Sequence, residues 1–367
     1  MRILVLTKRQ YTGKDLLDER FGRLFEIPAA LSEWGHDVRG IAISYRKRAQ
    51  GAYRWTEYPR LSWRSENALP LGLLCYNRIL SSATNEWMPD VVWSSGDMLQ
   101  CTLAFRWTRE CGLPLVIDLY DNYESFGLSR LPGLAQSFRV ACREAEGVTT
   151  VGSLLAQRVE HRYRRIRPTG IVQNGARKDL FVVRDRLECR RRLGLPLDGR
   201  LVGTAGAIND DRGISDLFEA FLALASRDEQ LWLVHAGVTD STPARFRHPR
   251  IVDLGVLPLE QVPFVLSALD VGVVCNRDSE FGRYCMPLKL FEMLSTRTPV
   301  VAAEVGEAAR VLAAHPECLY EPGNSLDLAG KIEYQLSTPQ VDALPAAPSW
   351  ADCARGLEAF LMPLVRG

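Results

Sequence analysis

Short runs of apolar and β-branched residues alternate along the chain with segments in which apolar residues recur every three or four positions. The runs are typical of buried parallel strands, and the three-to-four spacing is typical of amphipathic helices. Their alternation predicts an α/β fold of parallel sheets covered by helices. In the first half the predicted strands are Arg2–Thr7, Asp37–Ile43, Asp90–Ser95, Pro114–Leu119, Gly147–Val151 and Gly170–Gln173. The predicted helices include Arg20–Trp34, Asp97–Cys111 and Pro132–Glu146.

The second half repeats this pattern, with predicted strands at Leu201–Gly206, Leu231–Ala236, Ile251–Leu254, Val271–Cys275, Pro299–Ala303 and Cys318–Glu321. Its predicted helices are Gly213–Ala225, Glu260–Leu269, Pro287–Leu294 and Ser325–Leu336. A chain of 367 residues exceeds the usual size of one domain. We therefore expect two Rossmann-like, doubly wound domains, residues 1–173 and 174–349, with a helix in 350–367 that rejoins the first. Such sheets bind ligands at the carboxyl ends of their strands, so a cleft between the domains is the expected site.

Composition and charge exclude several classes of function. The nine cysteines include no C-x-x-C pair and no Cys/His cluster with zinc spacing, which favours reduced thiols in a cytoplasmic protein. An apolar run follows Met1-Arg2 at once, so we expect a first strand there and no signal peptide. No segment reaches the roughly 18–20 apolar residues of a membrane span. With a net charge of +1 and no nucleic-acid-binding motif, we expect no nucleic acid partner.

A glycine-rich segment follows the predicted strand Leu201–Gly206 and leads into a helix at Gly213. Glycine lets a ligand approach the backbone, Arg212 supplies positive charge, and a helix N-terminus offers unpaired N–H groups. These features describe a phosphate site. An ordinary β–α turn with a solvated arginine has the same composition, and this segment alone favours that plainer interpretation.

A second segment, residues 276–294, follows the buried strand Val271–Cys275 and ends in a helix that Pro287 can begin. Lys289 and Glu292 are three residues apart, so they share one face of that helix near its positive end. A lysine there can meet a phosphate, and a glutamate one turn further can accept hydrogen bonds from two ribose hydroxyls. The alternative interpretation is a surface Lys–Glu ion pair of small energetic value.

In the first half, a polar and aromatic segment, Asp118–Glu124, directly follows the strand Pro114–Leu119. Tyr120 and Asp121 are well placed there to meet a sugar, although an ordinary capping turn would use the same residue types. No Asp-x-Asp follows a predicted strand, so we expect no metal and no other cofactor. Protein cations and helix N-termini would neutralise a diphosphate instead.

Taken together, these segments resemble glycosyltransferase family 4, whose members are retaining enzymes of GT-B fold. The similar segments, in family order, are Gly35–Val38, Val172–Gly175 with Phe181, Gly206–Gly213, Met286–Leu294, Thr298–Val301 and Ser349–Trp350. They resemble the G-H-x-V signature, the P-N-G hinge, the G-R-x-x-x-x-K-G loop, the two parts of the P-L-K-x-x-E donor motif, and the start of the closing helix. The resemblance extends over essentially the whole chain.

The resemblance implies that Arg212 and Lys289 bind a donor diphosphate and that Glu292 binds the ribose. Other residues implied in the donor site are Gly206, Gly213, Asn276 and Pro287, with Gly13 and Gly22 in loops that face the donor. The implied catalytic residues are Tyr120, Asp121 and Glu280. The sequence departs from the family at three positions: Ala207 replaces an arginine, Tyr120 replaces a histidine, and Tyr284 replaces a glutamate. Glu280 would then take the role of that missing glutamate.

We therefore expect transfer of a sugar from a nucleotide diphosphate sugar to a sugar or lipid-linked acceptor, with retention, in surface polysaccharide or glycolipid assembly. Interleaved aromatic and basic residues over 45–64, and a basic run over 158–167, suit an anionic membrane surface. Peripheral contact with the inner membrane surface is thus expected, the alternative being a solvated loop with its aromatics packed on the core. Two further functions stay open: a nucleotide-sugar epimerase of the same fold, and a non-catalytic nucleotide-sugar-binding relative.

Overall fold

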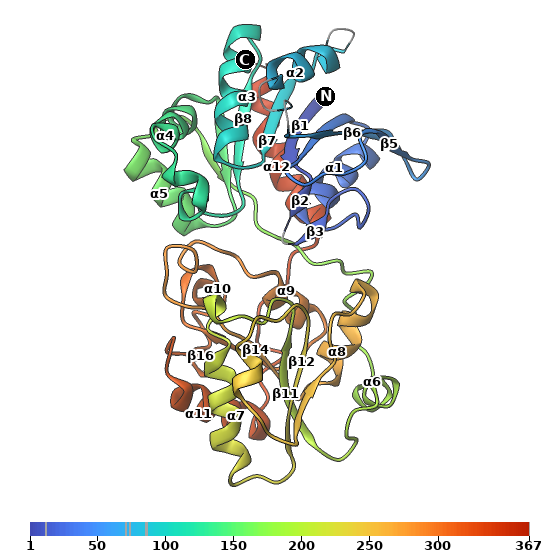
Figure 1. The fold of residues 1–367 in the computed structure, drawn as a ribbon, viewed down its shortest axis with the longest axis vertical. Coiled ribbons are helices and arrows are strands. Elements are labelled where there is room, and N and C mark those ends of the chain that lie inside the picture. Colours follow the sequence, from blue (N-terminus) through green and yellow to red (C-terminus); the bar gives the residue numbers. More distant parts are fainter. Residues whose placement is uncertain (12, 70–71, 73–74, 85–86, 367) are drawn as a thin grey trace. The chain divides into compact units, whose positions relative to one another are not determined.

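A computed structural model describes residues 1–11, 13–69, 72, 75–84 and 87–366. The chain divides into two compact units, which we call unit 1 (Met1–Asn174 with Trp350–Gly367) and unit 2 (Gly175–Ser349). Each unit is a mostly parallel sheet with helices on its faces (Figure 1). Gly367, the last residue of the predicted final helix, lies outside the described residues.

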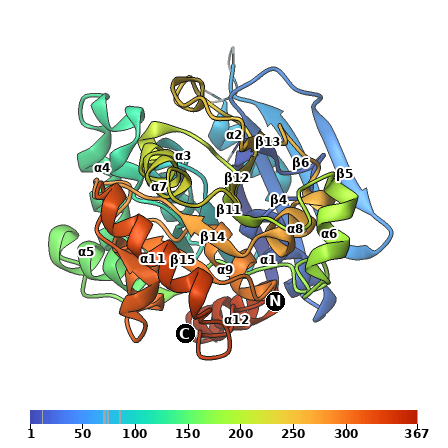
Figure 2. The ribbon, with the colours of Figure 1, turned by 90° about the horizontal axis from the view of Figure 1, so that it is seen from below.

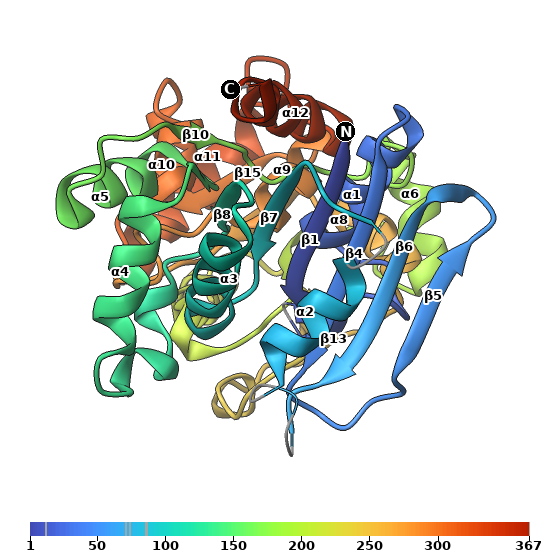
Figure 3. The same cartoon turned by 90° about the horizontal axis from the view of Figure 1, so that it is seen from above.

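Unit 1 contains an eight-stranded sheet in the order β10-β9-β8-β7-β1-β4-β6-β5 (Figure 3). Neighbouring strands are parallel except for β5, which pairs antiparallel with β6 at one edge. The strands are β1 (Arg2–Lys8), β4 (Asp37–Ser44), β5 (Gly51–Trp55), β6 (Tyr58–Asn67), β7 (Val91–Ser95), β8 (Leu115–Leu119), β9 (Gly147–Thr150) and β10 (Thr169–Ile171). A small hairpin of β2 (Gln10–Tyr11) and β3 (Lys14–Asp15) follows β1.

The helices of unit 1 are α1 (Arg23–Glu33), α2 (Tyr76–Thr84), α3 (Met98–Cys111), α4 (Leu134–Glu144), α5 (Ser153–Tyr163) and α12 (Trp350–Arg366). The first and last of these pack together on one face of the sheet, and α3 and α4 cover the other (Figure 3). Gly147 and Gly170 make room for α12, because a Cβ on either would lie 2.6 Å from the Phe360 ring. The closing helix is therefore an integral part of unit 1.

A buried ion pair lies at the carboxyl end of β8. Arg23, in the first turn of α1, has a side chain with 0% exposure, and its Nη2 lies 2.7 Å from Oδ1 of Asp118. The Asp118 carboxylate also accepts hydrogen bonds from the hydroxyls of Ser95 and Thr149, at 2.5 and 2.7 Å. Nη1 of Arg23 donates to the carbonyl oxygen of Val172 at 2.9 Å. One ion pair thus joins α1 and the segment that leaves unit 1 to three neighbouring strands.

Unit 2 contains a six-stranded parallel sheet in the order β13-β12-β11-β14-β15-β16. Its strands are β11 (Arg200–Ala205), β12 (Leu231–Ala236), β13 (Ile251–Asp253), β14 (Val271–Val274), β15 (Val300–Ala303) and β16 (Leu319–Tyr320). Its helices are α6 (Arg186–Leu193), α7 (Ser215–Ala225), α8 (Val262–Ala268), α9 (Leu288–Ser295), α10 (Gly306–Val311) and α11 (Ser325–Ser337), with a 3-10 turn, η3 (Asp210–Arg212), before α7. The chain enters and leaves this unit side by side, through a bridge between Ala176 and Ser349.

Helices cover both faces of the unit 2 sheet (Figure 2), and a hydrophobic core fills the space between the sheet and the helices on each face. Helices α7 and α11 supply one core, with Phe218, Phe221 and Ile332 fully buried. Helices α6, α8, α9 and α10 supply the other, with Leu266 and Leu290 fully buried. Because helices cover both faces of the sheet, the strand sequences are continuous apolar runs, and polar side chains are concentrated at the strand ends.

Every predicted strand overlaps an observed one, with ends that differ by at most two residues. The sequence-based prediction lacked the strands β2, β3, β5 and β6 and the helices α2, α5, α6 and α10. In β6, which lies next to the edge strand β5, buried and exposed residues are mixed, so the segment resembles a polar loop. The α6 sequence, Arg-Leu-Glu-Cys-Arg-Arg-Arg-Leu, lacks the broad apolar stripe from which an amphipathic helix is recognised. Within the described part of the chain, no helix has the length and apolar character needed to cross a membrane.

Removing one partner of the Arg23–Asp118 pair should leave an unpaired charge in the core of unit 1. We expect Arg23→Ala to lower the free energy of unfolding by about 3–5 kcal/mol. Urea denaturation followed by circular dichroism measures this change. Arg2→Ala is the control, because Arg2 forms an exposed ion pair with Asp90 at 3.1 Å and should cost less than about 1 kcal/mol. Equal effects of the two substitutions would contradict the structural role of the buried pair.

Candidate functional site

The strand order of unit 2 identifies where its sheet would bind a ligand. From β11 the chain moves to β12 and β13 on one side, then returns to β14, β15 and β16 on the other. The adjacent carboxyl ends of β11 and β14 therefore form a topological switch point, where open parallel sheets usually bind ligands. Gly206 follows β11 directly and Asn276 lies just beyond β14. The structure thus brings these two predicted site residues together at this point.

Lys289 lies against Gly206. A Cβ added to Gly206 would lie 3.6 Å from Cε and 3.7 Å from Nζ of Lys289, and the φ of this glycine is 109°, where glycine is strongly favoured. The lysine is the second residue of α9, which begins at Leu288. The prediction that Pro287 is the first helical residue is wrong by one position, because its ψ of 117° is extended. The lysine ammonium is therefore near the positive end of a helix and beside exposed backbone.

Lys289 and Glu292 are partly buried, and neither side chain forms a hydrogen bond or ion pair with a described residue. Burial, together with the nearby charge of Arg212, lowers the pKa of Lys289 to about 8. Burial raises the pKa of Glu292 to about 7, although the Lys289 ammonium opposes this shift. Both groups are held closer to their neutral forms than in water, which costs stability while they have no partner. The structure therefore does not show the Lys–Glu surface ion pair of the alternative interpretation.

Arg212 supplies a second cation on the loop after β11. Its guanidinium lies 4.1 Å from the centroid of the Phe281 ring, and its Nη1 lies 3.9 Å from Sγ of Cys285. Gly213, in the left-handed conformation with φ 70°, closes the η3 turn before α7. Because the charge of Arg212 acts on the pKa of Lys289, the two cations are close enough to share one anion.

Arg277, a residue that the sequence patterns did not indicate, holds the same loop in place. Its Nη2 lies 2.7 Å from Oδ1 of Asp210, and its Nε donates to the Asp210 carbonyl oxygen at 2.6 Å. The Ser215 hydroxyl donates to the same carboxylate at 2.6 Å. The two charged residues are 67 positions apart, so only the folded sheet brings them into contact. The Arg277–Asp210 ion pair therefore stabilises the loop that carries Arg212.

Asn276 organises the loop between β14 and α9. It is buried, and its Nδ2 donates to the Gly282 carbonyl oxygen at 3.2 Å, while Oδ1 has no hydrogen-bond partner among the described residues. Glu280 lies exposed in this loop, and its charge stabilises the guanidinium of Arg283. Asn276 therefore shapes the loop, and the catalytic role of Glu280 stays a prediction.

In unit 1, Tyr120 belongs to a buried aromatic cluster that follows β8. Its ring centroid lies 5.0 Å from that of Tyr11 and 5.2 Å from that of Tyr123, and its hydroxyl donates to the Gly96 carbonyl oxygen at 3.0 Å. Burial raises the pKa of Tyr120 well above its usual value, which disfavours proton transfer from this hydroxyl. The adjacent Asp121 is less buried, and is the more accessible polar group of the two.

Gly13 and Gly22 lie near this cluster in sequence, on either side of the β3 strand. Both have positive φ, and a Cβ on Gly22 would lie 2.6 Å from the Tyr11 ring, whereas a Cβ on Gly13 would meet no atom within 4 Å. The buried Arg9 holds the hairpin through Asp15, with Nε 2.9 Å from Oδ2. Gly22 is thus required for packing and Gly13 for its turn, and their position facing a donor stays a prediction.

The two basic segments of unit 1 are only partly available to a membrane. Trp63 is buried in the core, with 1% exposure. In the second segment, Arg165 is buried and donates to backbone carbonyls, while Arg158 and Arg162 lie 3.4 and 3.6 Å from Glu124. These contacts favour a structural role for much of the second segment.

The described residues contain no group of three His, Cys, Asp or Glu side chains that could hold a metal ion. The unit 2 site instead combines two cations, one carboxylate and the backbone at a glycine. This set of groups suits an anionic ligand that also carries hydroxyl groups.

Comparison of sequences relates unit 2 to glycosyltransferases. Residues 199–338 match the family model "Glycosyl transferases group 1". TuaC of Bacillus subtilis (strain 168), which is named as a glycosyltransferase of teichuronic acid biosynthesis, is 32% identical over 145 residues, or 40% of this chain and 35% of TuaC. The 2-deoxystreptamine glucosyltransferase of Streptomyces kanamyceticus is 27% identical over 187 residues, or 46% of this chain and 43% of that enzyme. The chain therefore spans less than half the length of these relatives.

Comparison of structures extends over both units. A sucrose-phosphate synthase from Thermosynechococcus elongatus has a TM-score of 0.75 and 15% identity, covering 100% of this chain and 96% of that one. Anabaena Alr3699/HepE, solved in complex with UDP, has a TM-score of 0.71 and 17% identity, covering 100% and 98%. With its two Rossmann-like parallel sheets, the chain has the GT-B fold of these proteins.

Proposed function

We propose that this protein transfers a sugar from a nucleotide diphosphate sugar to an acceptor. The observation that carries the proposal is the partly buried pair Lys289 and Glu292, whose side chains form no hydrogen bond or ion pair with a described residue, with Lys289 beside Gly206 at the switch point of unit 2. These residues fall within the segment that matches the glycosyltransferase family model. Related folds solved in complex with UDP and with UDP-glucose support a nucleotide sugar as the donor.

The proposed roles follow from the chemistry of each group. Lys289 and Arg212 would bind the diphosphate, and the N-terminus of α9 would add to the positive potential. Glu292, one turn further along the helix, would accept hydrogen bonds from the ribose hydroxyls. Ligand binding would then supply the partners that both charged groups lack in the ligand-free protein, so part of the burial cost is recovered on binding.

Transfer with retention is part of the proposal. The leaving diphosphate, stabilised by Lys289 and Arg212, would take the acceptor proton on the same face of the sugar, so that positioning and charge stabilisation carry the reaction. Asp121 would orient the acceptor, and the buried Tyr120 would position Asp121. The acceptor would be a sugar or a lipid-linked sugar of a surface polysaccharide or glycolipid, reached through peripheral contact of unit 1 with the inner membrane surface.

Substitution of the two α9 residues tests the donor site. A hydrogen bond to a charged group is worth roughly 1.5–3 kcal/mol, so Lys289→Ala should weaken UDP binding about tenfold to a hundredfold. Glu292→Gln keeps the shape but loses the charge, and should weaken UDP binding while having less effect on pyrophosphate. Isothermal titration calorimetry measures both affinities.

Lys178→Ala is the matched control, because Lys178 is exposed and lies outside the site. It should bind UDP like the parent protein. Lys289→Ala should unfold at a temperature no lower than the parent, since it removes a partly buried charge that forms no hydrogen bond or ion pair with a described residue. Unchanged UDP affinity in both α9 variants would overturn the proposed function.

The pKa values predict a pH optimum for UDP binding. Because the diphosphate favours charged Lys289, affinity should fall as the pH rises through about 8, where the ligand-free lysine loses its proton. Affinity should also fall below about pH 7, where the ligand-free Glu292 gains one. Titrations from pH 6 to 9 should show the upper decrease disappear in Lys289→Ala and the lower one diminish in Glu292→Gln. Identical profiles in all three proteins would contradict this assignment.

Neutralisation of the diphosphate by protein cations predicts that transfer does not need a divalent metal ion. Release of the nucleoside diphosphate from the preferred donor should therefore be largely unchanged after dialysis against EDTA. Complete loss of turnover, restored by Mg²⁺ or Mn²⁺, would show that the diphosphate is neutralised by a metal ion instead.

A further inference from the structure

The position of the Arg212 side chain depends on two loops that are distant in sequence. Its backbone belongs to the η3 turn after β11, where its N–H donates to Oδ1 of Asn209 at 3.2 Å. Its guanidinium lies instead against the loop between β14 and α9, at 4.1 Å from the centroid of the Phe281 ring. A shift of one loop relative to the other would therefore move this charge.

Arg277 joins these two loops directly. It follows Asn276 in the β14–α9 loop, and its side chain donates to the carbonyl oxygen and the carboxylate of Asp210, at 2.6 and 2.7 Å. It also donates to the Ser215 hydroxyl at the start of α7, at 3.3 Å. Because Asp210 lies in the η3 turn only two residues before Arg212, this contact fixes the turn that carries the cation of the donor site.

Glycines on both loops allow this close approach. A Cβ on Gly213 would lie 3.2 Å from Cγ of Arg277, and a Cβ on Gly282 would lie 2.0 Å from the Arg277 carbonyl oxygen. The Ser215 hydroxyl, followed by Arg277, holds the pKa of Asp210 below its usual value, so this carboxylate is charged at neutral pH. The two loops therefore pack closely around a charged pair.

The Arg277–Asp210 pair is not explained by stability. The two side chains are 39% and 43% exposed, and exposed ion pairs usually add little to the free energy of unfolding. The pair nevertheless connects residues 67 positions apart and ends beside the turn of Arg212. The consequence of such a contact is the position of the neighbouring charge.

We propose that Arg277 is a positioning residue of the donor site, which holds the η3 turn against the β14–α9 loop so that Arg212 can share a diphosphate with Lys289. The inference rests on the proposed function, because it assigns one diphosphate to both cations. Arg277 acts through Arg212, since its own guanidinium is occupied by Asp210 and Ser215. Without Arg277 the Arg212 side chain would occupy other positions as well, and ordering it on binding would cost affinity.

Calorimetric titration of the full chain with UDP tests the proposal through a double-mutant cycle. Arg277→Met keeps an unbranched side chain but removes the guanidinium, and should weaken UDP binding about fivefold to tenfold. In the Arg212→Ala background the same change should have no further effect, whereas in the Lys289→Ala background it should still weaken binding. Asp210→Asn, which removes the other member of the ion pair, should reproduce the effect of Arg277→Met.

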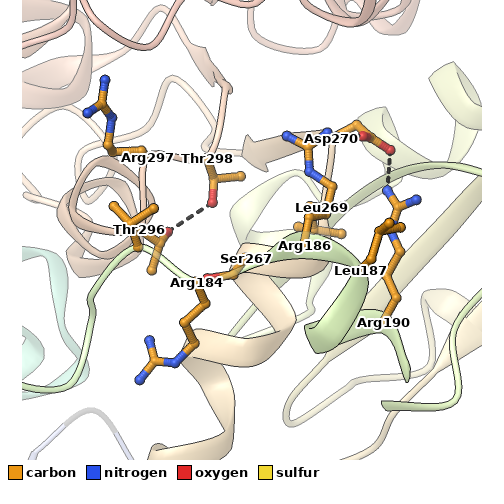
Figure 4. A pocket seen from close by; sticks show the side chains of 11 residues that line it. Arg184, Arg186, Leu187, Arg190, Ser267, Leu269, Asp270, Thr296, Arg297 and Thr298 are labelled. Carbon is orange, nitrogen blue, oxygen red and sulfur yellow. Dashed lines mark hydrogen bonds and ion pairs between the residues drawn. The ribbon is translucent and has the colours of Figure 1, made fainter. Parts of the chain in front are cut away.

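Two other arginines of unit 2 provide matched controls. Arg186 pairs with Asp270, 84 positions away, in a pocket of about 400 Å³ at the amino ends of β14 and β15 (Figure 4). Arg283 forms an exposed ion pair with Asp278 inside the β14–α9 loop. Arg186→Met and Arg283→Met should bind UDP like the parent protein, which excludes a general effect of lost positive charge. All three methionine variants should have similar midpoints of unfolding in urea, because each loses a half-exposed ion pair.

Equal effects of Arg277→Met in the parent and in the Arg212→Ala background would overturn the proposal, because Arg277 would then act on the ligand itself. Parent-like UDP affinity in both Arg277→Met and Asp210→Asn would also overturn it. Weaker binding in Lys289→Ala would in that case leave the proposed function standing. A urea midpoint of Arg277→Met far below that of Arg186→Met would show a structural role instead of a positioning one.

Discussion

Parallel strands bring all their carboxyl ends to one edge of a sheet, and the polar chemistry of both units depends on this constraint. The faces of each sheet are covered by helices, so charged side chains gather at the strand ends. In unit 1, that edge holds Asp118 together with the hydroxyls of Ser95 and Thr149 from the neighbouring strands. In unit 2, it holds Gly206 and Asn276, with Lys289 delivered by the helix that follows.

The two sheet edges differ in whether their buried charges form ion pairs. In unit 1 the Asp118 carboxylate meets Arg23 in a two-point contact, and Asp118 holds the pKa of Arg23 high although burial alone would lower it. That charge is satisfied within the fold and serves to connect its parts. In unit 2, Lys289 and Glu292 are partly buried and form no hydrogen bond or ion pair with a described residue, and their pKa values move toward neutrality. A fold that leaves charge unsatisfied gives up stability, and an anionic ligand with hydroxyl groups would restore it.

The sequence was most informative about features that depend only on residues close together in the chain. Continuous apolar runs predicted every strand of the two buried sheet centres, and the spacing of Lys289 and Glu292 was enough to place them on one face of a helix. Contacts between distant segments could not be predicted in this way. Arg23 and Asp118 are 95 positions apart, and nothing in either local pattern indicates the other. Tyr120 shows the same limit, because its position after a strand did not indicate that its hydroxyl donates to Gly96 inside a buried cluster.

The direction of helix α9 explains why an anionic ligand of unit 2 would bind at the carboxyl ends of the strands. At its N-terminus, unpaired N–H groups and the helix dipole favour an anion, so Lys289 and Arg212 add to a potential that the backbone already provides. At its C-terminus the dipole has the opposite sign and disfavours an anion. A phosphate there needs side-chain cations to outweigh the helix end. The arginines near that end, Arg186, Arg190 and Arg297, already pair with Asp270 or Asp342, so the N-terminal end of α9 is the one that favours an anionic ligand.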